Sequence, residues 1–340
     1  MKERNSSIDI VKFVIAIHIV LLHSAMVFQY DLFQNGYIFV EWFYIFAGFM
    51  VARKIVNSDN KLDTFLTSCS IIRDRIVNIY PYYFLSCTIA LLMKLKIGLF
   101  AITKAWTVHR IIFEYLMLYA TTLIPLNLTD VSWFLSAMWI ALIILVPLGV
   151  KFKHNFYRVS VFIFLIIYYY IYISTGHIWG PDEWTPFGYK GLLRAIGSIS
   201  LGFFGYEIHL IIKDKLNHYI IESLFIILSY VGVFYYVFNY SHDEYYFLLP
   251  VIFLILIVIQ MSMKRFIIPD CLFTRLLGKF SMIIFLNHFY IFLYIQNTSF
   301  ASTREKVYIG LVGTVLVSIF VYAIVDTIKY LNKHIKSISN

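Results

Sequence analysis

The sequence predicts an all-α, polytopic integral membrane protein with about ten transmembrane helices and both termini in the cytoplasm. Of its 340 residues, 61% are hydrophobic and 14% charged, with a mean hydropathy of +0.78, which is far outside the range of soluble domains. Ten apolar runs are long enough, at about 20 residues, to cross a bilayer. Most of the 28 lysines and arginines fall in alternate loops. We therefore attribute the net charge of +9 to topology and expect no nucleic-acid partner.

The predicted spans follow one another along nearly the whole chain. They cover residues 8–26, 36–52, 79–100, 132–150, 158–174, 191–211, 219–239, 246–262, 281–297 and 306–328. No small-residue cleavage site follows the first run, so we expect it to remain as a span. Residues 111–124 form a shorter apolar stretch that holds Glu114 and is expected to be interfacial or re-entrant. We find no repeat or soluble segment, which predicts a single transmembrane domain over residues 1–340.

The first span carries ionisable residues, which are costly in hydrocarbon unless they are paired or line a cavity. Lys12 and His23 are eleven residues apart, so on an ideal helix they lie on one face and about 16 Å apart along the axis. The topology places Lys12 near the cytoplasmic end and His23 in the outer half. Histidine is the usual general base near neutral pH. The alternative is that His23 makes an interhelical hydrogen bond and that Lys12 extends to the inner surface beside Asp9. His18 lies off this face and is interpreted as structural.

The second and third spans add charges on opposite sides of the membrane. Glu41 opens the second span on the outer side, where it either orients an imidazole or contacts an acceptor, or is an interfacial carboxylate in water. Arg73 and Arg75 precede the third span on the cytoplasmic side. Two guanidinium groups at this spacing are suited to phosphate, although a topological signal that contacts anionic lipid is the alternative.

Three later spans contribute further candidates. Ser132 and Trp133 begin the fourth span at the outer surface, where aromatic rings either anchor a helix or pack against sugars. Arg194 lies within the sixth span among glycines that allow close helix approach, which favours a functional role. His288 is a second membrane histidine, in the ninth span, and would be structural if considered alone.

The three cysteines, Cys69, Cys87 and Cys271, show neither paired spacing nor an accompanying histidine pattern. We therefore predict no disulfide framework and no metal site.

The order of these motifs resembles the acyltransferase 3 family of membrane enzymes, which O-acylate bacterial surface glycans. The family opens with an Asp, an Arg three residues later and a His eleven residues after that, matched here by Asp9, Lys12 and His23. Residues 43–49 match the family's Phe-Phe-x-x-Ser-Gly-Phe element, and Arg73, Arg75, Tyr80 and Pro81 match its basic run before Tyr-Pro. Residues 133–136 match its Trp-x-Leu-Ser element. Gly278, Ser281 and His288 match its late Gly-x-x-Ser to His element. Lys12 stands where the family usually has arginine, and Ala47 where it usually has serine.

The resemblance implies an O-acyltransferase that moves an acyl group, with acetyl as the first expectation, from cytoplasmic acyl-CoA to a hydroxyl of a cell-surface or exported polysaccharide. It implies a multi-pass protein of the bacterial plasma or inner membrane. The donor acetyl-CoA, or another acyl-CoA, is a substrate, so no permanently bound cofactor is expected. Its expected partners are the lipid bilayer, the glycan acceptor and polysaccharide synthesis or export machinery. The implied roles are catalysis for His23, Lys12 and Glu41, donor binding for Arg73, Arg75 and Lys12, and orientation of acceptor or base for Trp133, Ser132, Arg194 and His288.

Other functions stay open at this point. Ten spans with buried charges also describe many transporters of polysaccharides or small solutes, although we find no inverted repeat. An O-succinyltransferase, or transfer of a longer acyl chain, fits the same motifs. A noncatalytic partner subunit is a further alternative, because Lys12 and Ala47 depart from the family pattern.

Overall fold

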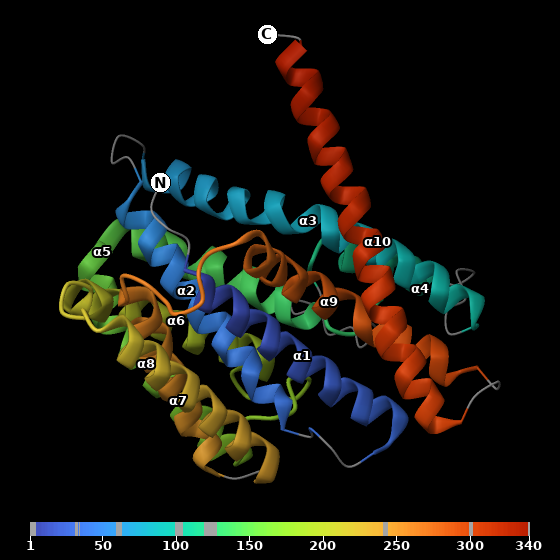
Figure 1. Ribbon diagram of the computed structural model, residues 1–340, viewed down its shortest axis with the longest axis horizontal. Helices are drawn as coiled ribbons and strands as arrows, with labels where there is room; N and C mark the ends of the chain where they lie inside the picture. Colours follow the sequence, from blue (N-terminus) through green and yellow to red (C-terminus); the bar gives the residue numbers. More distant parts are fainter. Residues whose placement is uncertain are drawn as a thin grey trace.

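The computed structural model is built almost entirely of helices (Figure 1). It describes residues 5–30, 33, 35–58, 63–98, 105–118, 128–240, 244–298 and 302–338. The helices are α1 (Ser6–Phe28), α2 (Phe39–Val56), α3 (Thr64–Lys96), α4 (Ala105–Tyr115), α5 (Ser132–Thr175), α6 (Lys190–Ile212), α7 (Tyr219–Asn239), α8 (Leu249–Ser262), α9 (Leu272–Gln296) and α10 (Thr303–Ile338), with two 3-10 turns, η1 (Gly36–Ile38) and η3 (Glu244–Leu248). A two-residue antiparallel hairpin, β1 (Trp184–Thr185) and β2 (Gly188–Tyr189), precedes α6.

Seven of the described helices are long and apolar enough to cross a membrane, namely α1, α3, α5, α6, α7, α9 and residues 303–332 of α10. Helix α2 carries Glu41, Arg53 and Lys54, and α8 is only 14 residues long, so neither is among the seven. The all-helical membrane fold is confirmed. The count of ten spans and the cytoplasmic position of the termini stay predictions.

Two of the predicted spans follow each other within α5 without an intervening loop. Helix α5 covers both 132–150 and 158–174, and the chain breaks direction at Lys153, whose φ of 45° and ψ of −128° are not helical. Just past the break, Glu207 of α6 holds the second half of α5, since its carboxylate lies 2.7 Å from His154 Nδ1 and accepts a 2.8 Å bond from Arg158 Nε. The expected loop between these spans is therefore a kink fixed by a neighbouring helix.

Helix α4 is the structured part of the stretch around residues 111–124. Its 11 residues give a length of about 16 Å, which is too short to cross the hydrocarbon core of about 30 Å. Residues 119–127 lie outside the described part of the chain, so the second half of the stretch is not placed.

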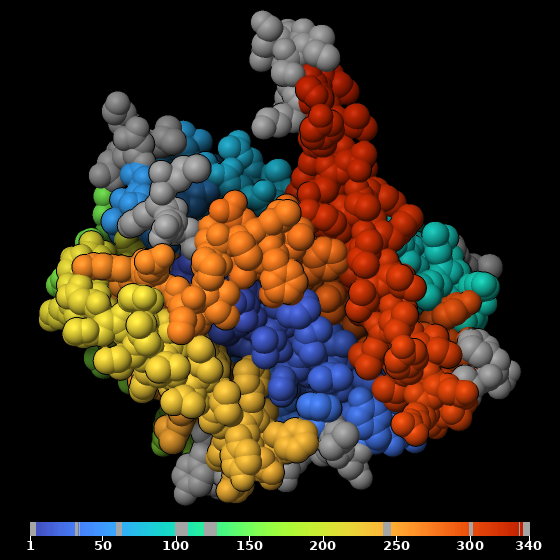
Figure 2. Space-filling view, viewed as in Figure 1, coloured from blue at the N-terminus to red at the C-terminus, as the bar shows by residue number. Residues whose placement is uncertain are grey.

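The most extensive helix contacts join α5 to α6, α1 to α9 and α2 to α6, with α9 also against α10. In Figure 1, α1 runs beside α9 and between α9 and the α7–α8 pair. Helix α10 lies along the edge of the bundle, and its C-terminal end projects past the other helices, as the space-filling view also shows (Figure 2). Helix α1, which carries Lys12 and His23, therefore packs mainly against α9, and α2, which carries Glu41, packs mainly against α6.

Helices α2 and α6 approach each other through two glycines. A Cβ atom at Gly48 would lie 2.1 Å from the carbonyl oxygen of Ile199, and one at Gly202 would lie 2.1 Å from that of Ile45. Both obstacles are backbone atoms, which cannot move aside as a flexible side chain can. The sequence places glycine at the two positions where these helix backbones touch.

We predict that Gly48→Val or Gly202→Val prevents α2 and α6 from packing. Overpacking costs about 1–3 kcal/mol even where neighbours adjust, and here the backbone would have to move. Thermal unfolding of the purified protein in detergent should show a marked loss of folded yield or melting temperature. The control is Gly232→Val in α7, where a built Cβ meets no atom within 4 Å and should change neither quantity. Equal melting temperatures for all three variants would contradict the close contact.

Candidate active site

Two histidines from opposite ends of the chain meet between α1 and α9. His23 Nδ1 lies 2.7 Å from His288 Nε2, and His288 Nδ1 lies 3.2 Å from the carbonyl oxygen of Ile284. His288 is fully buried and His23 half-buried. The structure therefore brings together the residue predicted as the base and one predicted to orient it, although 265 residues separate them in sequence.

Glu41 and Arg194 form a buried ion pair between α2 and α6. Arg194 Nε donates to Glu41 Oε1 at 2.6 Å, and both side chains have at most 1% exposure. The hydroxyls of Tyr168 and Ser198 each donate to Glu41 Oε2 at 2.5 Å. The alternative of an interfacial carboxylate in water is therefore wrong for Glu41. Its hydrogen bonds to described residues include no imidazole, so Glu41 orients Arg194 and not His23 in this structure.

Aromatic rings connect this ion pair to the histidines. The guanidinium carbon of Arg194 lies 5.8 Å from the ring centre of Trp133. Phe134, the next residue, lies 5.4 Å from the ring of Phe285, which in turn lies 5.8 Å from that of His288. A continuous chain of side chains therefore runs from the Arg194 pair to His288.

Ser132 is buried at the first turn of α5 and hydrogen-bonds to Glu114 of α4. Burial raises the pKa of Glu114 to about 7, and the nearby Asp130 acts in the same direction, while the Ser132 hydroxyl and Lys94 oppose the shift. Ser132 thus contacts a second buried carboxyl group that the sequence analysis did not select. In the sequence, Glu114 is distinguished only by its position in an apolar stretch.

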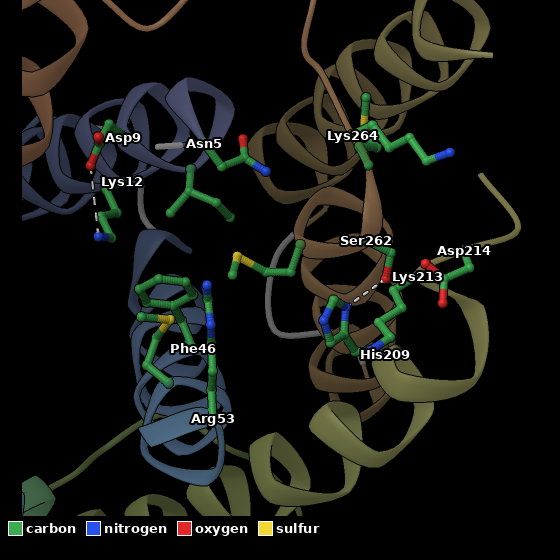
Figure 3. Close-up of a pocket in the computed structure, with 14 residues that line it drawn as sticks. Asn5, Asp9, Lys12, Phe46, Arg53, His209, Lys213, Asp214, Ser262 and Lys264 are labelled. Carbon is green, nitrogen blue, oxygen red and sulfur yellow. Dashed lines mark hydrogen bonds and ion pairs between the residues drawn. The ribbon is translucent and has the colours of Figure 1, made fainter. Parts of the chain in front are cut away.

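Lys12 lines a cavity of about 660 Å³ near the N-terminal end of α1 (Figure 3). Its ammonium group lies 3.9 Å from Asp9 Oδ1 and 4.5 Å from the ring centre of Phe46. Side chains of α1 and α2 form one wall, and His209, Lys213 and Ser262 face them from the other side. Three further cations line this cavity: Arg53, Lys213 and Lys264. Their sequence positions do not predict a site, because basic residues at helix ends are typical topology signals.

Helix α9 also touches the Asp9 end of α1. A Cβ at Gly278 would lie 2.1 Å from Asp9 Oδ1, so a larger residue at 278 would displace the carboxylate beside Lys12. Two motifs that are separate in sequence, Asp9 with Lys12 and the late glycine, therefore belong to one contact.

Arg73 and Arg75 point in different directions from α3. The Arg73 side chain is 72% exposed and lies 3.5 Å from Asp74, whereas Arg75 Nη2 donates at 3.1 Å to the carbonyl oxygen of Ala47. Residues two apart on a helix are about 200° apart around its axis, so they do not converge on one ligand by themselves. Neither residue lines the cavity that contains Lys12.

His18 packs against aromatic rings, with its ring centre 4.5 Å from that of Phe234 and 5.3 Å from that of Phe39. This environment agrees with its structural interpretation. Within the described ranges, no three His, Cys, Asp or Glu side chains are grouped as a metal ion would require.

Comparison with known families identifies a match over almost the whole chain. A family model described as "Acyltransferase domain", that of acyltransferase 3, matches residues 5–323. Comparisons with curated proteins and with solved structures gave no match.

We predict that removing the charge of Arg194 alone is more damaging than removing both charges of its pair. In Arg194→Met the Glu41 carboxylate stays buried without a cation, which should cost about 3–5 kcal/mol of unfolding free energy. The double variant Glu41→Gln, Arg194→Met leaves no unpaired charge and should recover part of the loss. Unfolding titrations in mixed micelles would measure the three free energies. A double variant as unstable as Arg194→Met would contradict the pairing.

Proposed function

The chain belongs to the acyltransferase 3 family, and from this premise we propose that it transfers an acyl group, acetyl in the first instance, from acyl-CoA to a glycan hydroxyl. As a multi-pass membrane acyltransferase, it would take its donor from the cytoplasm of a bacterial cell and its acceptor from a cell-surface or exported polysaccharide. The observation that carries this proposal is the layout of α1. A basic cavity lies at one end of the helix, around Lys12, and a histidine pair lies eleven residues further along.

The cavity suits the phosphate-bearing end of a coenzyme A donor. Lys12, Arg53, Lys213 and Lys264 supply four cations, and the acids that line it are Asp9, already beside Lys12, and Asp214. Ammonium and guanidinium groups make charge-assisted hydrogen bonds to phosphate oxygens. The donor would enter from the cytoplasm, the side that the distribution of basic residues assigns to this end. Arg73 and Arg75 stay predicted as donor contacts outside the cavity.

We assign His23 to the reacting centre. As general base it would take the proton of an acceptor hydroxyl while the oxygen attacks the thioester carbonyl. The carbon–sulfur bond then breaks, and the departing thiolate takes this proton to give free coenzyme A. The products are the ester and coenzyme A, so the transfer balances without any further reagent.

The outer half of the bundle would hold the acceptor. Trp133 offers an aromatic face, Arg194 is held by Glu41 beneath it, and Ser132 begins the same turn of α5. We assign to Glu41 the role of holding Arg194 in position. Glu41 would then affect the reaction by orienting the acceptor and not by transferring a proton. The acceptor machinery would be the synthesis or export system that delivers polysaccharide to this side.

The test of the function is acyl transfer by the purified protein in liposomes. Labelled acetyl-CoA outside vesicles that contain deacetylated bacterial polysaccharide should yield labelled ester, and succinyl-CoA in a parallel assay decides the acyl group. A transporter would move solute without consuming the donor.

We predict that His23→Ala reduces the rate of this transfer by about 10²- to 10⁴-fold, the usual contribution of a general base. His18→Gln on the same helix is the matched control and should keep the wild-type rate, because His18 packs among phenylalanines away from His23. Normal transfer by His23→Ala, with the protein folded as judged by size-exclusion chromatography, would rule out the proposed centre.

We predict that Arg53→Gln and Lys213→Gln each raise the KM for acyl-CoA about tenfold, since a hydrogen bond to a charged group contributes about 1.5 kcal/mol. The KM for the acceptor should stay unchanged, and the donor effect should shrink at high salt. Lys215→Gln removes a nearby exposed cation that does not line the cavity and should leave both constants unaltered. An equal change for donor and acceptor would contradict the assignment of the cavity to the donor.

A further inference from the structure

The partners of His288 fix where its hydrogen lies. Its Nδ1 faces the carbonyl oxygen of Ile284 at 3.2 Å, and a carbonyl oxygen only accepts hydrogen bonds. Nδ1 must therefore carry a hydrogen. His288 is fully buried, and none of its contacts within the described residues is a carboxylate, so nothing there favours a charged ring. In the neutral ring, Nε2 is then an acceptor with a free lone pair.

This acceptor decides the state of His23. The short contact between His288 Nε2 and His23 Nδ1, at 2.7 Å, needs one donor and one acceptor. Because His288 Nε2 accepts, His23 Nδ1 must donate. A neutral His23 ring has only one N–H group, so its other nitrogen, Nε2, keeps a lone pair.

The geometry favours a linear bond between the two rings. Their planes differ by 18°, and their centres are 4.9 Å apart although the nitrogens are only 2.7 Å apart. The rings therefore meet edge to edge in nearly one plane, since stacked rings do not bring ring nitrogens this close. The ring centre of Phe289 lies 5.0 Å from that of His23, and the ring centre of Phe292 lies 5.8 Å from that of His288. These neighbours hold both rings in an apolar setting.

The two histidines also differ in their burial. His288 has no exposure, whereas His23 is only half-buried, and within the described part of the chain His23 makes no other hydrogen bond. The one carboxylate of the predicted catalytic set, Glu41, is occupied by Arg194, Tyr168 and Ser198. The orienting partner of His23 is therefore a second imidazole, backed by a main-chain carbonyl.

We propose that His288 is a positioning residue that fixes His23 in the Nδ1–H form, so that His23 Nε2 is the basic atom of the site. The proposal rests on the proposed function for its chemical meaning. The acceptor hydroxyl gives its proton to His23 Nε2 as the oxygen bonds to the thioester carbon, and the thiolate that leaves takes the proton from the same atom. While His23 is charged, its Nδ1–H bond to His288 becomes charge-assisted and stabilises the cation. His288 keeps its own hydrogen on Nδ1, where it is donated to the carbonyl oxygen of Ile284, and transfers none.

The first test reads the hydrogen positions without any need for activity. Protein labelled with ¹⁵N-histidine is reconstituted in lipid vesicles, and the ring nitrogens of His23 are identified in NMR spectra by their absence in His23→Asn. The expected result is a protonated Nδ1 and a non-protonated Nε2, with a fall in the Nδ1–H population in His288→Met. A protonated Nε2 in the wild-type protein would overturn the proposal. This reading is independent of acyl transfer, so an inactive protein with the expected tautomer would count against the function alone.

The second test compares two replacements of similar length. His288→Gln keeps an oxygen that accepts from His23 Nδ1–H, whereas His288→Met has only a weakly accepting sulfur. We expect His288→Met to lower kcat by about 10²- to 10⁴-fold at an unchanged donor KM, by comparison with wrong-tautomer variants of other histidine bases. His288→Gln should recover at least about tenfold of this loss. Equal kcat values for the two folded variants would overturn the positioning role, because a purely structural histidine would not distinguish them.

Discussion

The proposed chemistry depends on the contact between α1 and α9. Asp9 meets Gly278 near one end of this helix pair, and His23 meets His288 further along, so the two helices run in the same direction. In hydrocarbon a polar side chain without a partner is costly, and α9 provides space or a hydrogen-bond partner for the polar side chains of α1. A glycine on α9 makes room for the carboxylate beside Lys12, and an imidazole on α9 accepts the hydrogen of His23. The same packing that stabilises the bundle therefore sets the positions of its two candidate functional ends.

The sequence predicts the helices well because hydropathy is a local property. The runs at 8–26, 191–211 and 219–239 correspond closely to α1, α6 and α7. The partners of charged residues cannot be predicted in this way, because they depend on which helices pack together. The apolar run around Arg194 predicts a cation inside a span, yet its carboxylate partner lies 153 residues earlier, on α2. The pairing of α2 with α6 through Gly48 and Gly202 creates that contact, and one sequence does not indicate that those two glycines meet.

The cations that line the cavity around Lys12 could not be predicted from the sequence for a different reason. Lysine and arginine are common at helix ends in multi-pass proteins because they set topology, so a site built from such residues has no distinct sequence pattern. Arg53, Lys213 and Lys264 lie at or just past the C-terminal ends of α2, α6 and α8 and converge only in the folded bundle. Arg73 and Arg75 are close in sequence, which favours a shared phosphate site. On the helix, however, their side chains point in different directions. Arg75 instead reaches Ala47 on α2 through the main-chain carbonyl, a contact that does not require a serine side chain at that position.

The surroundings of Lys12 explain how lysine serves where arginine is usual in the family. A guanidinium group would use its planar fork, whereas the lysine ammonium lies over the ring of Phe46 and beside Asp9, two contacts that a point charge makes without a fixed orientation. Beyond it, the face of α1 that leads to His23 presents Ala16 and Ile19, both buried and apolar. Under the proposed function, charge recognition at Lys12 and proton transfer at His23 would be separated by a buried apolar segment about 16 Å long. Such a separation would favour transfer over hydrolysis in the proposed reaction, because it would keep water that accompanies the donor phosphates away from a thioester near His23.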